Sequence, residues 1–223
     1  MDLDLRPLGR PKLGYEKRFV EIYEMIMQKK IPKPTFLDKL LRRKIPTEED
    51  LLQEMFDNQV DYSGLIRAPR VGRDREANNW IKKKYSESDK SVSESDLLKI
   101  NDGFYVLDLA KESDGVPFYN AVPEDKSAFR AQYLLDCVDL IGEDLVCEAW
   151  DTKLADATLD YGQRLMTVAD RIGNENNLQF LKNLRVPPNT DEDSIEFKLH
   201  VVYSLAKWLI FYGKNGHGYA ADF

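Results

Sequence analysis

The segment DSIEFKLHVVYSLAKWLIFY, residues 193–212, constrains the fold most, because its apolar residues cover most of a helix's circumference. Thr190 and Asp193 stand where a helix start is expected, and Gly213 stands where the helix should end. A helix with so few polar positions must be covered on nearly all sides. We therefore expect it at the centre of a bundle of helices.

Other segments show the periodicity of helices that could cover it. Residues 152–173 place Leu154, Thr158, Tyr161, Leu165, Val168 and Ile172 at alternating steps of four and three, which is typical of a packing seam. Further helices are predicted over 124–142, 143–150 and 174–184, and in the N-terminal part over 14–30, 36–43, 48–59 and 75–85. The sequence thus predicts a mainly α fold, a multi-helix globular bundle.

One segment is typical of β structure. FYVLDLA and VPFYNAV are rich in aromatic and β-branched residues and enclose a turn at Asp114 and Gly115. They predict a small β-hairpin near residues 104–121, which must lie on the helices because a lone hairpin is marginally stable.

The net charge of −7 is unevenly distributed. Residues 1–90 hold 20 Lys and Arg against 16 Asp and Glu, a balance of +4, whereas residues 91–223 hold 12 against 23, a balance of −11. A Ser-rich stretch lies where the sign changes. We expect a single mainly helical domain over 1–223, with 97–223 as its core bundle and 86–96 as a candidate sub-boundary.

Composition indicates a cytoplasmic protein. No stretch approaches the roughly 18 apolar residues of a membrane span, and the acidic N-terminus does not resemble a signal peptide. Cys137 and Cys147 lie among apolar neighbours, so we expect reduced, buried thiols, with a single disulfide as the alternative.

The hairpin is the first candidate binding site. It combines carboxylates with phenolic hydroxyls near a tight turn, and loops on rigid scaffolds often carry function. Architecture alone also explains these residues, since Asp-Gly favours a turn and the aromatic rings could pack on helices. The candidate binding residues are Tyr105, Asp108, Asp114, Tyr119 and, in a separate Gly-rich run, His217.

A second candidate is a set of paired acids. Asp136 with Asp139, and Glu148 with Asp151, are each three residues apart and could hold Mg²⁺ from one helix face. The arrangement resembles the E-x-x-E and E-x-x-D motifs of the all-α MazG-type nucleotide pyrophosphatases. That resemblance implies a Mg²⁺-dependent hydrolase of a phosphorylated small molecule. The alternative is a solvated acidic surface without any cofactor.

The remaining motifs favour neither catalysis nor nucleic acid. Motifs of nucleophilic enzymes are missing, and His200 has the position of a core histidine satisfied by Glu196. In the basic stretch 67–85, a helix would point Lys82, Lys83 and Lys84 in different directions, so they do not form one basic face. The acidic second half of the chain would also repel the phosphates of a nucleic acid. We therefore expect a non-catalytic, bacterial-type protein that binds a protein partner, as immunity and antitoxin proteins do. The Mg²⁺-dependent hydrolase is the alternative.

Overall fold

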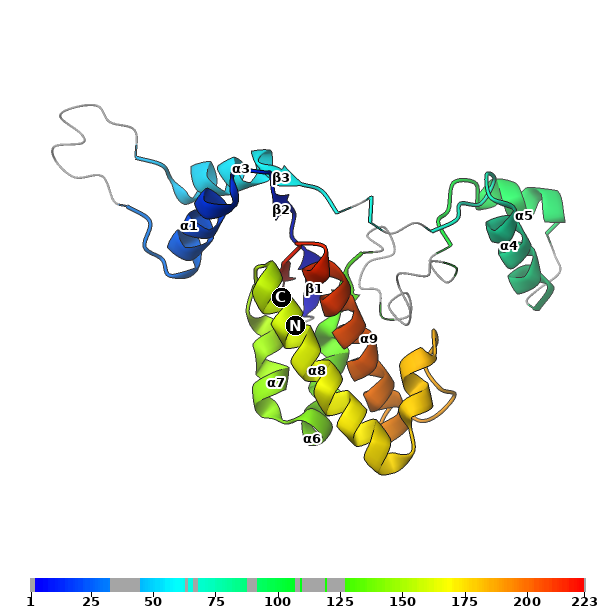
Figure 1. Cartoon of the computed structure of the whole chain (residues 1–223). Coiled ribbons are helices and arrows are strands. Elements are labelled where there is room, and N and C mark those ends of the chain that lie inside the picture. Colours follow the sequence, from blue (N-terminus) through cyan, green and yellow to red (C-terminus); the bar gives the residue numbers. More distant parts are fainter. Residues whose placement is uncertain are drawn as a thin grey trace. The chain divides into compact units, whose positions relative to one another are not determined.

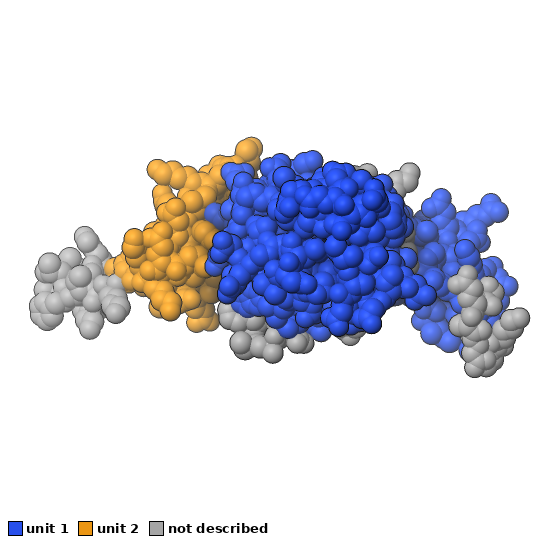
Figure 2. Space-filling view, turned by 90° about the horizontal axis from the view of Figure 1, so that it is seen from below, with its two compact units in different colours: residues 1–8, 63–223 blue, residues 9–62 orange. Residues whose placement is uncertain are grey.

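The computed structural model describes residues 3–32, 45–62, 64–65, 68–87, 92–106, 109, 119 and 127–222. Helices dominate these residues and the sheets are small and antiparallel, so the predicted mainly α globular fold is confirmed. The chain divides into two compact units, residues 1–8 with 63–223 and residues 9–62 (Figure 2). Neither limit falls within 86–96, where the sequence suggested a sub-boundary.

The larger unit is built around its two longest helices, α8 and α9 (Figure 1). Nearly every side chain in the middle of α9 is buried, as expected for a central helix, and Thr158, Tyr161, Leu165 and Ile172 of the predicted seam are buried on α8. Its helices are α4 (Arg75–Glu87), α5 (Glu94–Ile100), η4 (Ala131–Cys137), α6 (Val138–Ile141), α7 (Glu143–Cys147), η5 (Glu148–Trp150), α8 (Ala155–Asn176), η6 (Gln179–Asn183) and α9 (Ile195–Lys214), where η marks a 3-10 helix.

Glycines allow α8 and α9 to approach closely along an antiparallel contact. A Cβ added to Gly162 of α8 would lie 2.8 Å from the Leu209 Cβ, and one added to Gly213 of α9 would lie 2.7 Å from the Leu159 backbone nitrogen. Real Cβ atoms do not come so near, so these two positions accept only glycine without a shift of the helices.

The single helix predicted over 124–142 is wrong over its described part. Residues Phe129–Arg130 form strand β4, and the chain then runs through η4 and α6. Gly142 ends the helix as predicted, with a positive φ of 87°. The pattern of apolar residues was compatible with a helix, but pairing with the N-terminal strand decided the conformation of Phe129 and Arg130.

That strand belongs to a three-stranded antiparallel sheet, ordered β4-β1-β5, which the sequence did not predict. The central strand β1 (Asp4–Pro7) pairs with β4 on one side and with β5 (Tyr219–Asp222) on the other. The Arg130 side chain donates to the Asp4 carboxylate over 3.0 Å. None of these strands exceeds four residues, so no alternation of polar and apolar residues could develop.

Helices α4 and α5 pack on each other around a small apolar cluster of their own. Val71, Ala77, Ile81 and Val106 are buried there, and Trp80 lies half-buried against them. Trp80 therefore packs on the same apolar face of α4 as Ala77 and Ile81.

The smaller unit pairs two helices beside a two-stranded ladder. Thr47 and Asp50 form a capping box, in which each side chain accepts from the other residue's backbone N–H. The Glu54 carboxylate of α3 accepts from Tyr15 and from Arg18, the latter over 2.8 Å. The elements are β2 (Arg10–Pro11), α1 (Glu16–Met27), α3 (Glu48–Asp57) and β3 (Gln59–Val60).

Most of the predicted hairpin near 104–121 lies outside the described residues, so it stays a prediction. Within the described part, Tyr105 forms an isolated antiparallel bridge with Arg70.

Of the two free cysteines, Cys137 is buried as expected, but the expectation that Cys147 is buried is wrong, because it lies on the exposed side of α7. Among the described helices, none has the length and apolar character needed to cross a membrane.

Candidate functional site

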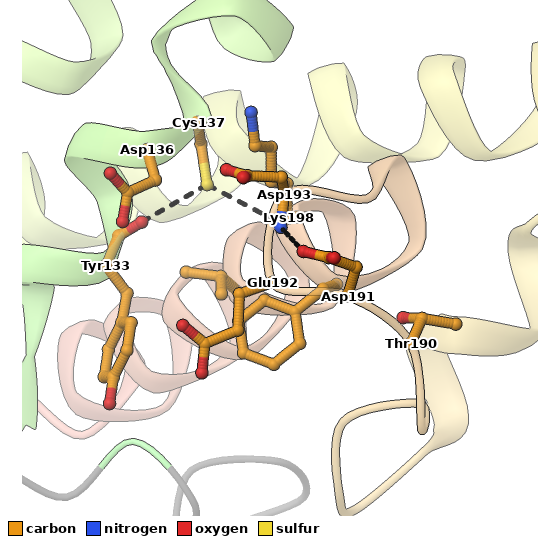
Figure 3. A pocket seen from close by; sticks show the side chains of 10 residues that line it. Tyr133, Asp136, Cys137, Thr190, Asp191, Glu192, Asp193 and Lys198 are labelled. Atoms are coloured by element: carbon orange, nitrogen blue, oxygen red, sulfur yellow. Dashed lines mark hydrogen bonds between the residues drawn. The ribbon is translucent and has the colours of Figure 1, made fainter.

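An acidic hollow of about 490 Å³ opens beside the start of α9, between η4 and the loop that precedes α9 (Figure 3). We call it the acidic hollow. It is lined by Tyr133, Asp136, Cys137, Thr190, Asp191, Glu192, Asp193, Phe197, Lys198 and Val201.

The loop before α9 is ordered by its own hydrogen bonds. Ser194, not Thr190, is the N-cap of α9, because its hydroxyl accepts from the Phe197 N–H over 3.2 Å. The Thr190 cap predicted from the sequence is therefore wrong. The Asp191 carboxylate accepts from the Asp193 N–H over 3.0 Å, which holds the acidic turn together.

The charge of the hollow is strongly negative. Asp191, Glu192 and Asp193 are exposed on the loop, and Asp136 is exposed on η4. Lys198 lines the hollow too, but its ammonium already binds the Asp139 carboxylate over 3.1 Å. Within the described residues, no ion pair is formed by the four lining carboxylates.

The fold tolerates this concentration of negative charge for a definite reason. Three of the carboxylates precede the first turn of α9, where the helix dipole and the unpaired N–H groups favour negative charge. The Coulombic attraction between Lys198 and Asp193 adds to this effect, although the Lys198 ammonium binds Asp139.

The floor of the hollow is apolar. Phe197 and Val201 are buried, and Tyr133 presents a half-buried ring. The Cys137 thiol lies between the carbonyl oxygens of Tyr133 and Lys198, at 3.4 and 3.6 Å. Burial raises the pKa of Cys137 to about 12, so this thiol stays protonated and is a poor nucleophile.

Behind this floor, Tyr119 and His200 form a buried neutral pair. His200 Nε2 lies 3.1 Å from the Leu184 carbonyl oxygen and must donate to it, so Nδ1 accepts from the Tyr119 hydroxyl over 2.9 Å. Burial lowers the pKa of His200 and raises that of Tyr119, which keeps both groups uncharged. His200 is buried in the core as predicted. Its hydrogen-bond partners are Tyr119 and the Leu184 carbonyl, however, and not the predicted Glu196.

The other predicted binding residues have separate surroundings. Tyr105 is half-exposed, and the Arg70 guanidinium lies 5.3 Å from its ring centre. His217 is buried, and its Nδ1 donates to the Leu8 carbonyl over 2.9 Å, which ties the end of α9 to the N-terminal strand. Asp108 and Asp114 lie outside the described residues.

The four acids considered for Mg²⁺ do not converge on one point, although Glu148 and Asp151 share the Lys153 ammonium. Asp139 binds Lys198, Asp151 lies 3.9 Å from the Lys153 ammonium, and Asp136 faces the acidic hollow. Glu148 accepts from Arg164 over 2.8 Å and pairs with Lys153 over 3.2 Å. Burial opposes the ionisation of Glu148, but these hydrogen bonds outweigh it and lower its pKa.

Those contacts leave no common cation site. Throughout the part of the chain that the structure describes, no group of three or more His, Cys, Asp or Glu side chains is placed to hold a metal ion. No known protein family, curated protein or solved structure matches the chain. The resemblance to the MazG-type motifs therefore gains no support beyond the four positions that suggested it.

Sequence reasoning missed the residues that line the acidic hollow, except for Asp136. The run Asp191–Asp193 was the available signal, because three consecutive acids just before a strongly apolar helix exceed what capping needs. The contribution of Tyr133 and Cys137 could not be anticipated, since they come from η4, about 60 residues earlier along the chain.

Proposed function

We propose that this protein binds a basic protein partner in a stoichiometric complex and that the acidic hollow is a centre of that interface. The supporting observation is a set of four carboxylates, unpaired within the described residues, over an apolar floor. The role resembles that of immunity and antitoxin proteins, which act by binding and not by catalysis.

The chemistry of the hollow suits a lysine or arginine side chain. Such a side chain has an apolar stem, which would lie on Phe197 and Val201, and a cationic head, which would reach the carboxylates at the rim. Arginine is also enriched among the residues that dominate binding energy at interfaces. The balance of −11 in residues 91–223 would add long-range attraction and speed association.

We also propose that the protein acts in the cytoplasm. Both cysteines are free thiols, and free thiols persist in reducing compartments. The buried Cys137 would then remain a packing residue, and the exposed Cys147 would remain reduced.

The test is affinity capture with the full chain as bait. Native extract at low salt should yield a basic protein in a one-to-one complex. The triple variant Asp191→Asn, Glu192→Gln, Asp193→Asn should weaken that complex about threefold to 150-fold, because each rim ion pair contributes about 0.2–1 kcal/mol. Asn at 191 retains an oxygen for the Asp193 N–H, so the loop should keep its shape.

The matched control carries the same charge change at other helix starts: Glu143→Gln, Asp144→Asn and Asp156→Asn. These side chains are exposed, and the control should bind like the unmodified chain. Failure to recover a stoichiometric partner would contradict the proposal. An equal loss in both triples would show that net charge, and not the hollow, attracts the partner.

A further inference from the structure

In residues 9–32 and 45–62 of the smaller unit, more large apolar side chains are exposed than buried. Among its described residues, Phe19, Ile22 and Leu51 are the large apolar side chains counted as buried. A small unit buries a small share of its surface in its core, and clustered exposed apolar residues mark interaction sites. The exposed ones are Leu13, Val20, Met27, Leu52, Phe56 and Val60.

Two of these residues form a ridge along α3. Leu52 and Phe56 are four residues apart, so they lie one above the other on the same helix face. Their exposed fractions are 50% and 67%, whereas the adjacent Leu51 points into the unit and is fully buried. We call this pair the α3 ridge. Rows of residues four apart are the ridges that pack into grooves of another helix.

The charges beside the α3 ridge restrict what can bind it. Glu48, Glu49 and Asp57 are exposed at the two ends of α3. The helix contains five acids and no lysine or arginine. Of the other acids, Asp50 belongs to the capping box and Glu54 is bound by Arg18. Asp57 accepts a hydrogen bond from the Gln53 side chain but stays exposed, as Glu48 and Glu49 do, so these three carboxylates could meet a partner.

We propose that the α3 ridge docks an amphipathic helix of a partner protein, in which lysine or arginine flanks an apolar stripe. The stripe would cover Leu52 and Phe56, and the bases would meet the carboxylates at both ends. Charge disfavours other occupants. A symmetric contact with the α3 of a second copy would set acid against acid, and nucleic acid or an anionic membrane would be repelled by the acids of α3. This inference rests on α3 alone and is independent of the acidic hollow.

The test uses a synthetic helical peptide with a leucine stripe and lysine flanks, and a counterpart in which glutamate replaces lysine. Binding is measured by fluorescence anisotropy in the triple variant of the acidic hollow, so that the hollow does not contribute. The lysine peptide should bind, and the glutamate peptide should not. Leu52→Ser with Phe56→Ser should weaken binding of the lysine peptide at least tenfold.

The matched control replaces two apolar residues of similar exposure in the larger unit, Phe180→Ser with Val186→Ser. It should leave binding of the lysine peptide unchanged. Equal affinity for both peptides, no binding of either, or no effect of the ridge variant would overturn the proposal.

A second readout asks whether the rest of the chain already covers the ridge. If the ridge faces solvent, Leu52→Ser with Phe56→Ser should lower Tm about as much as the control pair Phe180→Ser with Val186→Ser, because the exposed fractions are similar. If other residues of the chain cover the ridge, the additional lost burial should lower Tm by about 5 °C or more beyond the control, which would also overturn the proposal.

Discussion

Replacing Gly213 with alanine tests the contact that organises the larger unit. The added Cβ would lie 2.7 Å from the Leu159 nitrogen and 2.8 Å from its Cα and Cβ. Backbone atoms cannot rotate away, so α8 and α9 must separate, and overpacking of this kind costs about 1–3 kcal/mol. Alanine normally favours a helix over glycine by up to about 1 kcal/mol, but Gly213 is in the last turn, where little of that gain is realised.

We therefore expect the free energy of unfolding to fall by about 2 kcal/mol, because the steric cost exceeds the helix preference. For a chain of this size, the change corresponds to a Tm lower by about 4–8 °C. The assay is thermal unfolding followed by circular dichroism at the helical band.

Gly64→Ala is the matched control, since it adds the same methyl group where no atom lies within 4 Å. Its Tm should stay within about 2 °C of the unmodified chain. If Gly213→Ala leaves Tm unchanged or raises it, the close approach of α8 and α9 is wrong.

Two further predictions concern single hydrogen-bonded groups. Hydrogen bonds from Arg18 and then Tyr15 lower the pKa of Glu54 from 4.5 to about 2, so their stabilising effect should be complete above about pH 4.5 and lost as the pH falls through 2. Carboxyl NMR should show Glu54 titrating near 2, and a midpoint near 4.5 would refute the ion pair. Tyr119→Phe removes the donor to His200 Nδ1 and leaves a buried nitrogen unsatisfied, which should lower the free energy of unfolding by about 1–3 kcal/mol. Urea unfolding measures this loss, and an unchanged midpoint would show that the pair is not buried.

Some features were readable from the sequence because they depend on neighbours along the chain. The periodicity of residues 152–173 and 193–212 predicted α8 and α9, and the helix end predicted at residue 142 coincides with Gly142. Helical hydrogen bonds and caps join residues a few positions apart, so local spacing carries the information.

Local sequence patterns were less informative for segments whose conformation depends on pairing with residues distant in the sequence. Phe129 and Arg130 became a strand because Asp4 and Leu5 lie beside them, a pairing more than 120 residues apart that no local pattern records. The partners of His200 came in the same way from Tyr119 and from the chain after η6, while the nearby Glu196 was not chosen.

Part of the candidate site could be predicted from the sequence, and part depended on the tertiary structure. The sequence alone determined that the second half is acidic and that acids precede its most apolar helix. Only the tertiary structure placed Asp136, Tyr133 and Cys137 opposite those acids, and only it left Leu52 and Phe56 facing outward. The physical reason is that charge and helix periodicity are properties of short segments, whereas a hollow exists only when segments distant in sequence come together.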